Sequence, residues 1–209
     1  MMDNKLSLLL GIFVGLLVGM NLLGNKIISM LGISVSVAIF MVPLTFLITD
    51  IVSEVYGKKT AQHFVNIGMI VIVITLIYTA IFVQLNPHER FVNDEAYRMI
   101  FGSSIRIMIA SVIAFFLSQM HDVWAFEFWK KKTHGKMLWL RNNLSTFVSQ
   151  AIDSFVFMMI AFYNVSPKFT FFFVIQLAVP YYLFKITFAA ADTPLVYAGV
   201  KWLKQKDTK

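Results

Sequence analysis

Long apolar runs separated by short polar connections fill almost the whole chain. Six of these runs are long enough for helices that cross a membrane, since a crossing takes about 20 mainly apolar residues. The expected spans are residues 6–24, 33–53, 63–85, 100–129, 138–163 and 169–200. Gly24-Asn25-Lys26 and Gly32 interrupt the stretch between the first two spans, which predicts a tight turn there. The pattern therefore predicts an all-α, polytopic membrane protein with one transmembrane domain over residues 1–209.

The basic residues predict the orientation of these spans, because cytoplasmic loops of membrane proteins are enriched in Lys and Arg. In the six-span arrangement, twelve Lys and Arg residues fall on one side and four on the other. Arg106 and Lys185 lie within spans. The larger group marks the cytoplasmic side, so both termini are expected in the cytoplasm.

Composition narrows the class of protein further. Apolar residues make up 58% of the 209 residues, charged residues make up 14%, and the mean hydropathy is +0.74, which excludes an ordinary soluble domain. The net charge is +7, but membrane orientation and anionic lipid account for the basic loops and tail, so we expect lipid and not nucleic acid as a partner. Cysteine is absent, and the four histidines show no metal-ligand spacing. We expect neither a cofactor nor a metal.

A polar phrase of the form Ser-Gln-x-x-Asp-x-x-x-Phe occurs twice in the apolar region, beginning at Ser118 and at Ser149. On a helix, Gln and Asp three residues apart project from one face, which pairs Gln119 with Asp122 and Gln150 with Asp153. An Asp near the centre of a membrane helix costs about 2.5–3.5 kcal/mol on insertion scales, so a functional role facing a cavity is its default interpretation.

Both phrases lie about ten residues from the basic hairpin between the fourth and fifth spans, which puts them roughly 15 Å deep on antiparallel helices. Such a midplane arrangement is typical of a transporter built around a central site. In the fifth span, Asn142, Ser145, Ser149 and Asp153 recur at steps of three and four residues and form one polar stripe. Interhelical hydrogen bonding that holds the bundle together is the alternative explanation for the serines.

Other ionisable residues are candidates for a gate or for groups that support the site. Asp50 and Glu54 are four apart in the second span, either as an interfacial pair balanced by nearby lysines or, if deeper, as groups that share a proton or accept donors from a substrate. Lys185 needs an anion, and Asp192 is a candidate because it lies seven residues later on the same face. Ser145 completes this second set of candidates.

The last span is interrupted by Pro180 and by Asp192-Thr193-Pro194, where proline is expected to kink or break the helix. Motifs for nucleotide hydrolysis, dinucleotide binding or intramembrane proteolysis are missing from the sequence. We therefore expect a protein that is not an enzyme.

Four polar motifs stand out along the chain. They are Asp50-x-x-x-Glu54-x-Tyr56-Gly57, Ser118-Gln119-x-x-Asp122, Arg141-Asn142-Asn143-x-Ser145-Thr146-x-x-Ser149-Gln150-x-x-Asp153 and Asp192-Thr193-Pro194-Leu195-x-Tyr197. Together they resemble the queuosine precursor transporter family, also called the vitamin uptake transporter family. The resemblance runs from about residue 45 to the C-terminus, and its most specific part is the stretch from Arg141 to Asp153.

The resemblance implies a six-helix, multi-pass importer of the bacterial inner membrane. Its cargo would be purine-like precursors of queuosine, chiefly 7-cyano-7-deazaguanine and 7-aminomethyl-7-deazaguanine. A 7-deazaguanine has adjacent N–H donors that a carboxylate can accept and a carbonyl that suits an amide. The expected substrate contacts are Gln119, Asp122, Asn142, Gln150 and Asp153.

Two further functions remain open at this stage. The chain could be the substrate-binding membrane subunit of an energy-coupling-factor importer, which needs an ATPase partner. It could also be a membrane enzyme that uses the Asp pair for hydrolysis. The small size of the chain leads us to expect a homodimer.

Overall fold

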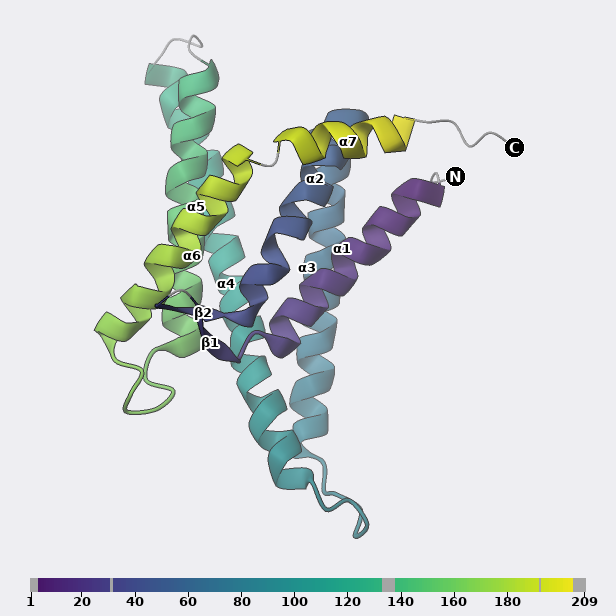
Figure 1. Ribbon diagram of the computed structural model, residues 1–209, viewed down its shortest axis with the longest axis vertical. Helices are drawn as coiled ribbons and strands as arrows, with labels where there is room; N and C mark the ends of the chain where they lie inside the picture. The colour runs from purple at the N-terminus through teal and green to yellow at the C-terminus, as the bar shows by residue number, and fades with distance from the viewer. Residues whose placement is uncertain (1–3, 31, 133–137, 192, 205–209) are drawn as a thin grey trace. The chain divides into compact units, whose positions relative to one another are not determined.

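The structure is a computed structural model that describes residues 4–30, 32–132, 138–191 and 193–204 (Figure 1). Within these ranges, the side chains of residues 122–123, 126–127, 130, 138–146, 189–191 and 193 lie outside the description. Seven α-helices dominate the described chain. They are α1 (Asn4–Leu23), α2 (Val42–Tyr56), α3 (Lys58–Gln84), α4 (Asp94–Lys132), α5 (Leu138–Phe162), α6 (Phe171–Ala191) and α7 (Thr193–Lys204).

Five described helical segments are long and apolar enough to cross a membrane. They are Asn4–Leu23, Val37–Tyr56, Lys58–Gln84, Asp94–His121 and Phe171–Phe188. The remaining expected span falls on α5, whose described apolar part, Phe147–Phe162, is shorter. The chain is therefore a helical, multi-pass membrane protein, as its apolar runs predicted, while the count of six spans and the orientation of the termini stay predictions.

The chain divides into two compact units. The first comprises Met1–Ile28, Ser36–Met108 and Thr187–Lys209, and the second comprises Ser29–Val35 and Ile109–Ile186. The first unit holds α1, α2, α3 and α7. The second holds α5, most of α6 and the C-terminal part of α4.

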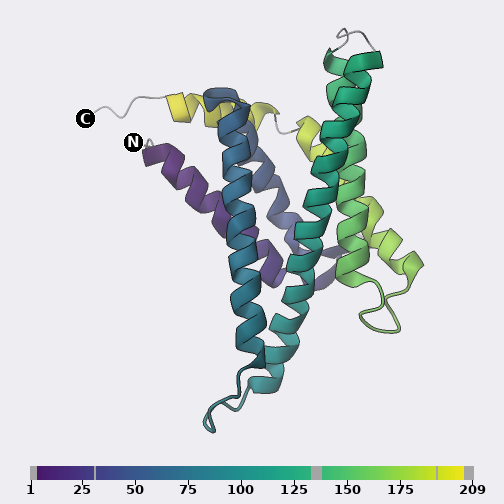
Figure 2. The ribbon, with the colours of Figure 1, turned by 180° about the vertical axis from the view of Figure 1, so that it is seen from behind.

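The core of the first unit is built from four helices. Leu9 and Phe13 of α1 pack with Val52 of α2, Phe64 of α3 and Leu203 of α7, and all five side chains are buried. Where this apolar surface would otherwise contact water, its burial stabilises the unit by about 25 cal/mol per Å². Both ribbon views draw α7 across the end of α2 (Figures 1 and 2).

Close approach between these helices depends on glycine. A Cβ at Gly68 of α3 would collide with Leu17 of α1 and would lie 3.1 Å from the Phe13 ring. A Cβ at Gly199 of α7 would collide with Ile51 of α2. Small residues let membrane helices pack closely, so both positions help to fix the unit.

A short β-hairpin corrects the all-α prediction and the predicted start of the second span at residue 33. Strands β1 (Ile27–Met30) and β2 (Ile33–Ser36) pair with each other, and a 3₁₀ helix, η1 (Val37–Phe40), follows. In β2, Ile33 and Val35 alternate with serines, a pattern that favours a strand. Gly32, which directly precedes β2, has a φ of +80°, which glycine adopts without steric cost.

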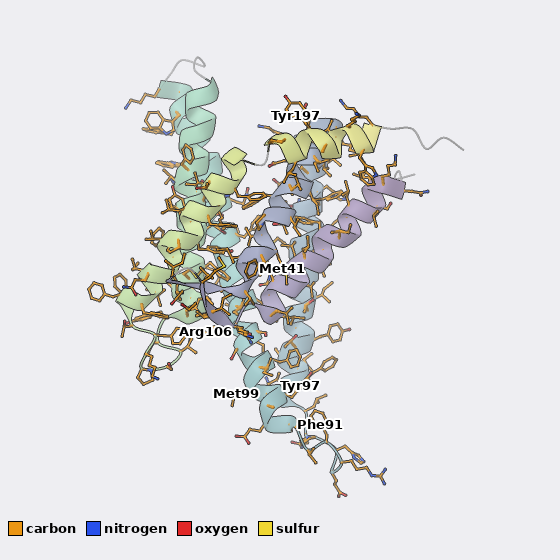
Figure 3. All side chains as sticks on the ribbon, in the orientation of Figure 1. Met41, Phe91, Tyr97, Met99, Arg106 and Tyr197 are labelled. Atoms are coloured by element: carbon orange, nitrogen blue, oxygen red, sulfur yellow. The ribbon has the colours of Figure 1, made fainter. Side chains whose placement is uncertain are left out.

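The final predicted span, residues 169–200, is also corrected, because it is two helices. Helix α6 ends at Ala191 and α7 begins at Thr193, in the region where the Asp-Thr-Pro sequence predicted an interruption, whereas α6 runs through Pro180 without ending. Helix α7 is amphipathic. Val196 and Val200 pack on the core of the first unit, while Tyr197 is 75% exposed on the opposite face (Figure 3).

Candidate functional site

An ion pair inside the apolar part of the second unit is the centre of the candidate site. The Lys185 ammonium of α6 donates to Oδ2 of Asp153 of α5 at 2.5 Å. The Lys185 side chain is 5% exposed, while the Asp153 side chain keeps 25% of its accessible surface. The pair is therefore more open on the carboxylate side than on the lysine side.

Two aromatic rings frame this pair. The Lys185 ammonium lies 4.7 Å from the centroid of the Tyr181 ring, one helical turn earlier on α6. Tyr181 in turn stacks on Phe157 of α5, with ring centroids 6.1 Å apart and planes inclined by 22°. A cation over an aromatic face gains about 2 kcal/mol when it is desolvated, so the ring adds to the carboxylate in holding the ammonium.

Buried polar atoms without partners flank Asp153 on the same helix. Within the described residues, neither the Gln150 side-chain carbonyl nor the Ser154 hydroxyl has a hydrogen-bond partner, although both atoms are buried. An unsatisfied buried group of this kind costs about 1–3 kcal/mol. Gln150 precedes Asp153 by three residues, so its acceptor and the carboxylate belong to one face of α5. These atoms are suited to receive donors from a ligand.

The two polar phrases meet in the second unit. Nδ1 of His121, from the first phrase on α4, lies 3.1 Å from the hydroxyl of Ser149, from the second phrase on α5. In both views, the C-terminal part of α4 runs beside α5 (Figures 1 and 2). The contact places the phrases at one level of an antiparallel helix pair, in agreement with their equal spacing from the basic hairpin.

The remaining expected substrate contacts lie on α4 and α5, and the structure describes the side chain of only Gln119 among them. Gln119 is exposed on α4. Asp122 lies on α4, and Asn142 and Ser145 lie on α5, but their side chains are outside the description. Asp192, the expected anion for Lys185, is outside the described residues, and among the described residues Lys185 pairs with the carboxylate of Asp153.

Asp50 and Glu54 lie on α2 of the first unit, and both are exposed. They share one face of α2, as their spacing of four residues predicted. No group of three or more His, Asp or Glu side chains that could hold a metal occurs among the described residues.

Sequence reasoning missed Tyr181 and Ser154 and gave Lys185 only a supporting position. A signal was available for Tyr181, because it precedes Lys185 by four residues and such residues are neighbours on a helix. Ser154 follows Asp153 directly and carried no distinguishing pattern. Its burial, with 0% exposure, depends on helix packing that the sequence does not specify.

Comparisons with known proteins agree with this picture. A family model described as "Putative vitamin uptake transporter" matches residues 36–199. A "Probable queuosine precursor transporter" from Bacillus subtilis is 29% identical over 185 residues, which cover 88% of this chain and 79% of that protein. A protein with the same description from Haemophilus influenzae is 28% identical over 144 residues, which cover 69% of this chain and 59% of the relative. No solved structure matches the chain.

The family match extends from the β-hairpin through all the polar motifs that carried the resemblance, up to Gly199 of α7. It includes the Asp153–Lys185 ion pair and both polar phrases. Apolar helices around a small polar cluster are common among membrane transporters. The chain therefore belongs to the vitamin uptake transporter family.

Proposed function

We propose that this protein imports 7-deazaguanine precursors of queuosine, namely 7-cyano-7-deazaguanine and 7-aminomethyl-7-deazaguanine. The names of the two relatives support this substrate class. The single observation that carries the proposal is the polar face of α5, where the unpartnered Gln150 carbonyl lies one turn from the partly open Asp153 carboxylate.

The chemistry of the cargo matches this face. A 7-deazaguanine has a ring N–H and an exocyclic amine side by side, and a carboxylate accepts such a pair of donors in bidentate fashion. The Gln150 carbonyl can accept a further N–H from the same base. Binding would satisfy an acceptor that is otherwise buried without a partner, and the free energy recovered, about 1–3 kcal/mol, would favour the occupied state.

We place the site at the midplane of the membrane, between the fourth and fifth spans. Gln119, Asp122 and Asn142 complete the proposed set of contacts, and Asp50, Glu54, Ser145 and Asp192 are proposed as gating or supporting groups. The hydrogen bond between His121 and Ser149 supports this arrangement, because it joins the two phrases that carry four of the five proposed substrate contacts.

The test is uptake of labelled 7-cyano-7-deazaguanine into vesicles that contain this chain as their only protein. We expect accumulation or equilibration above that of empty vesicles, with saturation as the substrate concentration rises. Absence of uptake from vesicles with correctly inserted protein would refute import by the chain alone. Recovery of uptake only with an ATPase partner would instead establish the energy-coupling-factor arrangement. A chemically altered base recovered from the vesicles would indicate an enzyme.

We also propose a topology, a membrane and an oligomeric state for this transporter. We propose six spans with both termini in the cytoplasm, insertion in the bacterial inner membrane and assembly as a homodimer. The excess of basic residues on one side supports the orientation, and the small size of the chain, 209 residues, supports the dimer. Accessibility of single cysteines introduced at each terminus tests the orientation, because the natural chain has none. The mass of the detergent-solubilised protein tests the dimer.

A further inference from the structure

We propose that Lys185 is the residue that determines substrate specificity, through direct contact with the base. Its ammonium donates to the 6-carbonyl oxygen while Asp153 accepts from the ring N–H and the 2-amino group. The inference rests on the proposed function and deepens it, because it makes the protein select 6-oxo-2-amino bases and prefer, among its cargo, the base with an uncharged group at position 7.

The starting observation is that donor and acceptor lie side by side in an apolar surrounding. Lys185 and Asp153 are 2.5 Å apart, come from two different helices, and are buried to different degrees. An ammonium has three donors and no acceptor, whereas a carboxylate has only acceptors. The pair therefore offers one edge with a fixed order of hydrogen-bonding groups.

That order is complementary to the edge of a guanine-type base. Along this edge the base carries a carbonyl acceptor, then a ring N–H donor, then an amino donor. Lys185 can meet the carbonyl while Asp153 meets both donors. Lys185 keeps free donor capacity for this contact, because an ammonium has three donors and one of them bonds Asp153.

An adenine-type base presents the opposite order, with an amino donor at position 6 and an unprotonated ring nitrogen beside it. The ammonium would then face a donor, and the carboxylate would face a lone pair. Sites that hydrogen-bond a substrate discriminate strongly against analogues that leave their buried groups unpaired. A mismatched bidentate contact is worth roughly a 10- to 100-fold difference in binding.

The charge on Lys185 has a second consequence, at position 7 of the base. In a 7-deazapurine, the substituent at position 7 lies on the same side of the fused rings as the 6-carbonyl. An ammonium that donates to this carbonyl therefore lies near the substituent. Like charges at short range repel, more strongly when they are poorly solvated. The neutral 7-cyano group is tolerated there, while the positively charged 7-aminomethyl group is disfavoured.

Tyr181 and Phe157 give the pair its rigidity. The Tyr181 ring holds the ammonium from one side at 4.7 Å, and Phe157 stacks on that ring. A long lysine side chain loses conformational entropy when it is ordered for binding, and here most of that loss has already occurred on folding. The ammonium is thus positioned before the base arrives.

The experiment is competition against uptake of labelled 7-cyano-7-deazaguanine in vesicles. We expect unlabelled 7-deazaguanine to compete at a concentration roughly 10- to 100-fold lower than 7-deazaadenine. We also expect the 7-cyano compound to compete better than the 7-aminomethyl compound. The inference would be overturned if, with the unaltered protein, 7-deazaguanine competed no better than 7-deazaadenine and the 7-cyano compound no better than the 7-aminomethyl compound. This result needs no variant. Failure of the unaltered protein to take up the labelled compound would count against the proposed function instead.

Two variants separate hydrogen bonding from charge. Lys185→Gln keeps a donor without the charge, so we expect it to retain the 6-oxo preference and to lose the discrimination against the aminomethyl compound. Lys185→Met removes both, so we expect it to lose the discrimination against the aminomethyl compound and to weaken the 6-oxo preference to the part that the Asp153 carboxylate supports. Preferences of Lys185→Gln identical to those of the unaltered protein would show that the lysine does not contact the base. Elution of each variant as a single folded species in detergent is the control for folding.

Discussion

Substitution of Asp153 by Asn is the sharpest perturbation of the buried ion pair. It removes the carboxylate and keeps the shape of the side chain, so Lys185, with 5% exposure, loses its only charged partner among the described residues. Removal of one member of a buried pair costs about 3–5 kcal/mol, because the remaining charge stays buried without compensation. We therefore expect a large loss of stability from a change of very few atoms.

The double variant Asp153→Asn with Lys185→Met provides the matched control. Replacement of a buried ion pair by uncharged groups of similar volume is neutral or stabilising. Met follows the path of the lysine stem and suits the apolar contacts around it. We expect the double variant to regain stability to within about 1 kcal/mol of the unaltered protein, and the two substitutions to be strongly non-additive.

Thermal unfolding of the purified protein in detergent measures both variants. For chains of this size, about 1 kcal/mol corresponds to roughly 2–4 °C, so Asp153→Asn should lower Tm by roughly 6–20 °C. The double variant should return close to the original Tm. An unchanged Tm for Asp153→Asn would show that the ammonium does not depend on this carboxylate, and our account of the ion pair would then be wrong.

The same proteins separate stability from function when uptake is measured in vesicles. We expect neither the single nor the double variant to transport 7-cyano-7-deazaguanine, because both lack the carboxylate that accepts from the base. A double variant that is both stable and fully active would reduce the ion pair to a structural contact between α5 and α6. Loss of uptake in a double variant of normal Tm would support direct participation in transport.

Three further substitutions test other parts of the structure. Gln150→Leu removes a buried carbonyl without a partner, so Tm should stay equal or rise while uptake is lost; a lowered Tm would reveal a structural role for this amide. Gly68→Leu should destabilise the α1–α3 contact by about 1–3 kcal/mol, whereas Gly11→Ala, with nothing within 4 Å of its Cβ, should be tolerated. Gly57→Ala should cost about 1–3 kcal/mol because φ is +87° and ψ is 161° there, a backbone conformation that is essentially restricted to glycine, and an unchanged Tm would contradict that strain.

The positions of most helices could be predicted because membrane helices follow directly from apolar length. Helix α5 is described from Leu138, the first described residue after residues 133–137, to Phe162, within the predicted span of 138–163. The errors fall where an apolar run is not a single helix. The stretch around the β-hairpin is rich in Ile and Val, which suit a strand and a membrane helix equally in a hydropathy pattern. Helix α7 continues the apolar run of the last predicted span, and its amphipathic pattern, together with the Asp-Thr-Pro sequence before it, distinguishes it from α6.

The candidate site could be predicted in part, because costly polar residues in an apolar segment are visible in the sequence. Gln150, Asp153 and Lys185 were all singled out on this ground. Their pairing was not predictable in the same way. Asp192 is a neighbour of Lys185 by helical spacing, whereas Asp153 is 32 residues earlier in the chain and reaches Lys185 only through the packing of α5 on α6. Local periodicity gives the residues on one face and does not select the facing helix.

The presence of this ion pair is itself an argument for function. Stability gives no reason to keep it, since uncharged side chains in the same volume would hold α5 and α6 together equally well or better. The neighbouring Gln150 carbonyl and Ser154 hydroxyl add a further cost, because both atoms are buried without partners. The ion pair, the Gln150 carbonyl and the Ser154 hydroxyl all lower the stability of the protein without ligand. Their presence is explained if a ligand with matching donors and acceptors restores this stability when it binds. The partly open carboxylate of Asp153 is where such a ligand would first make contact.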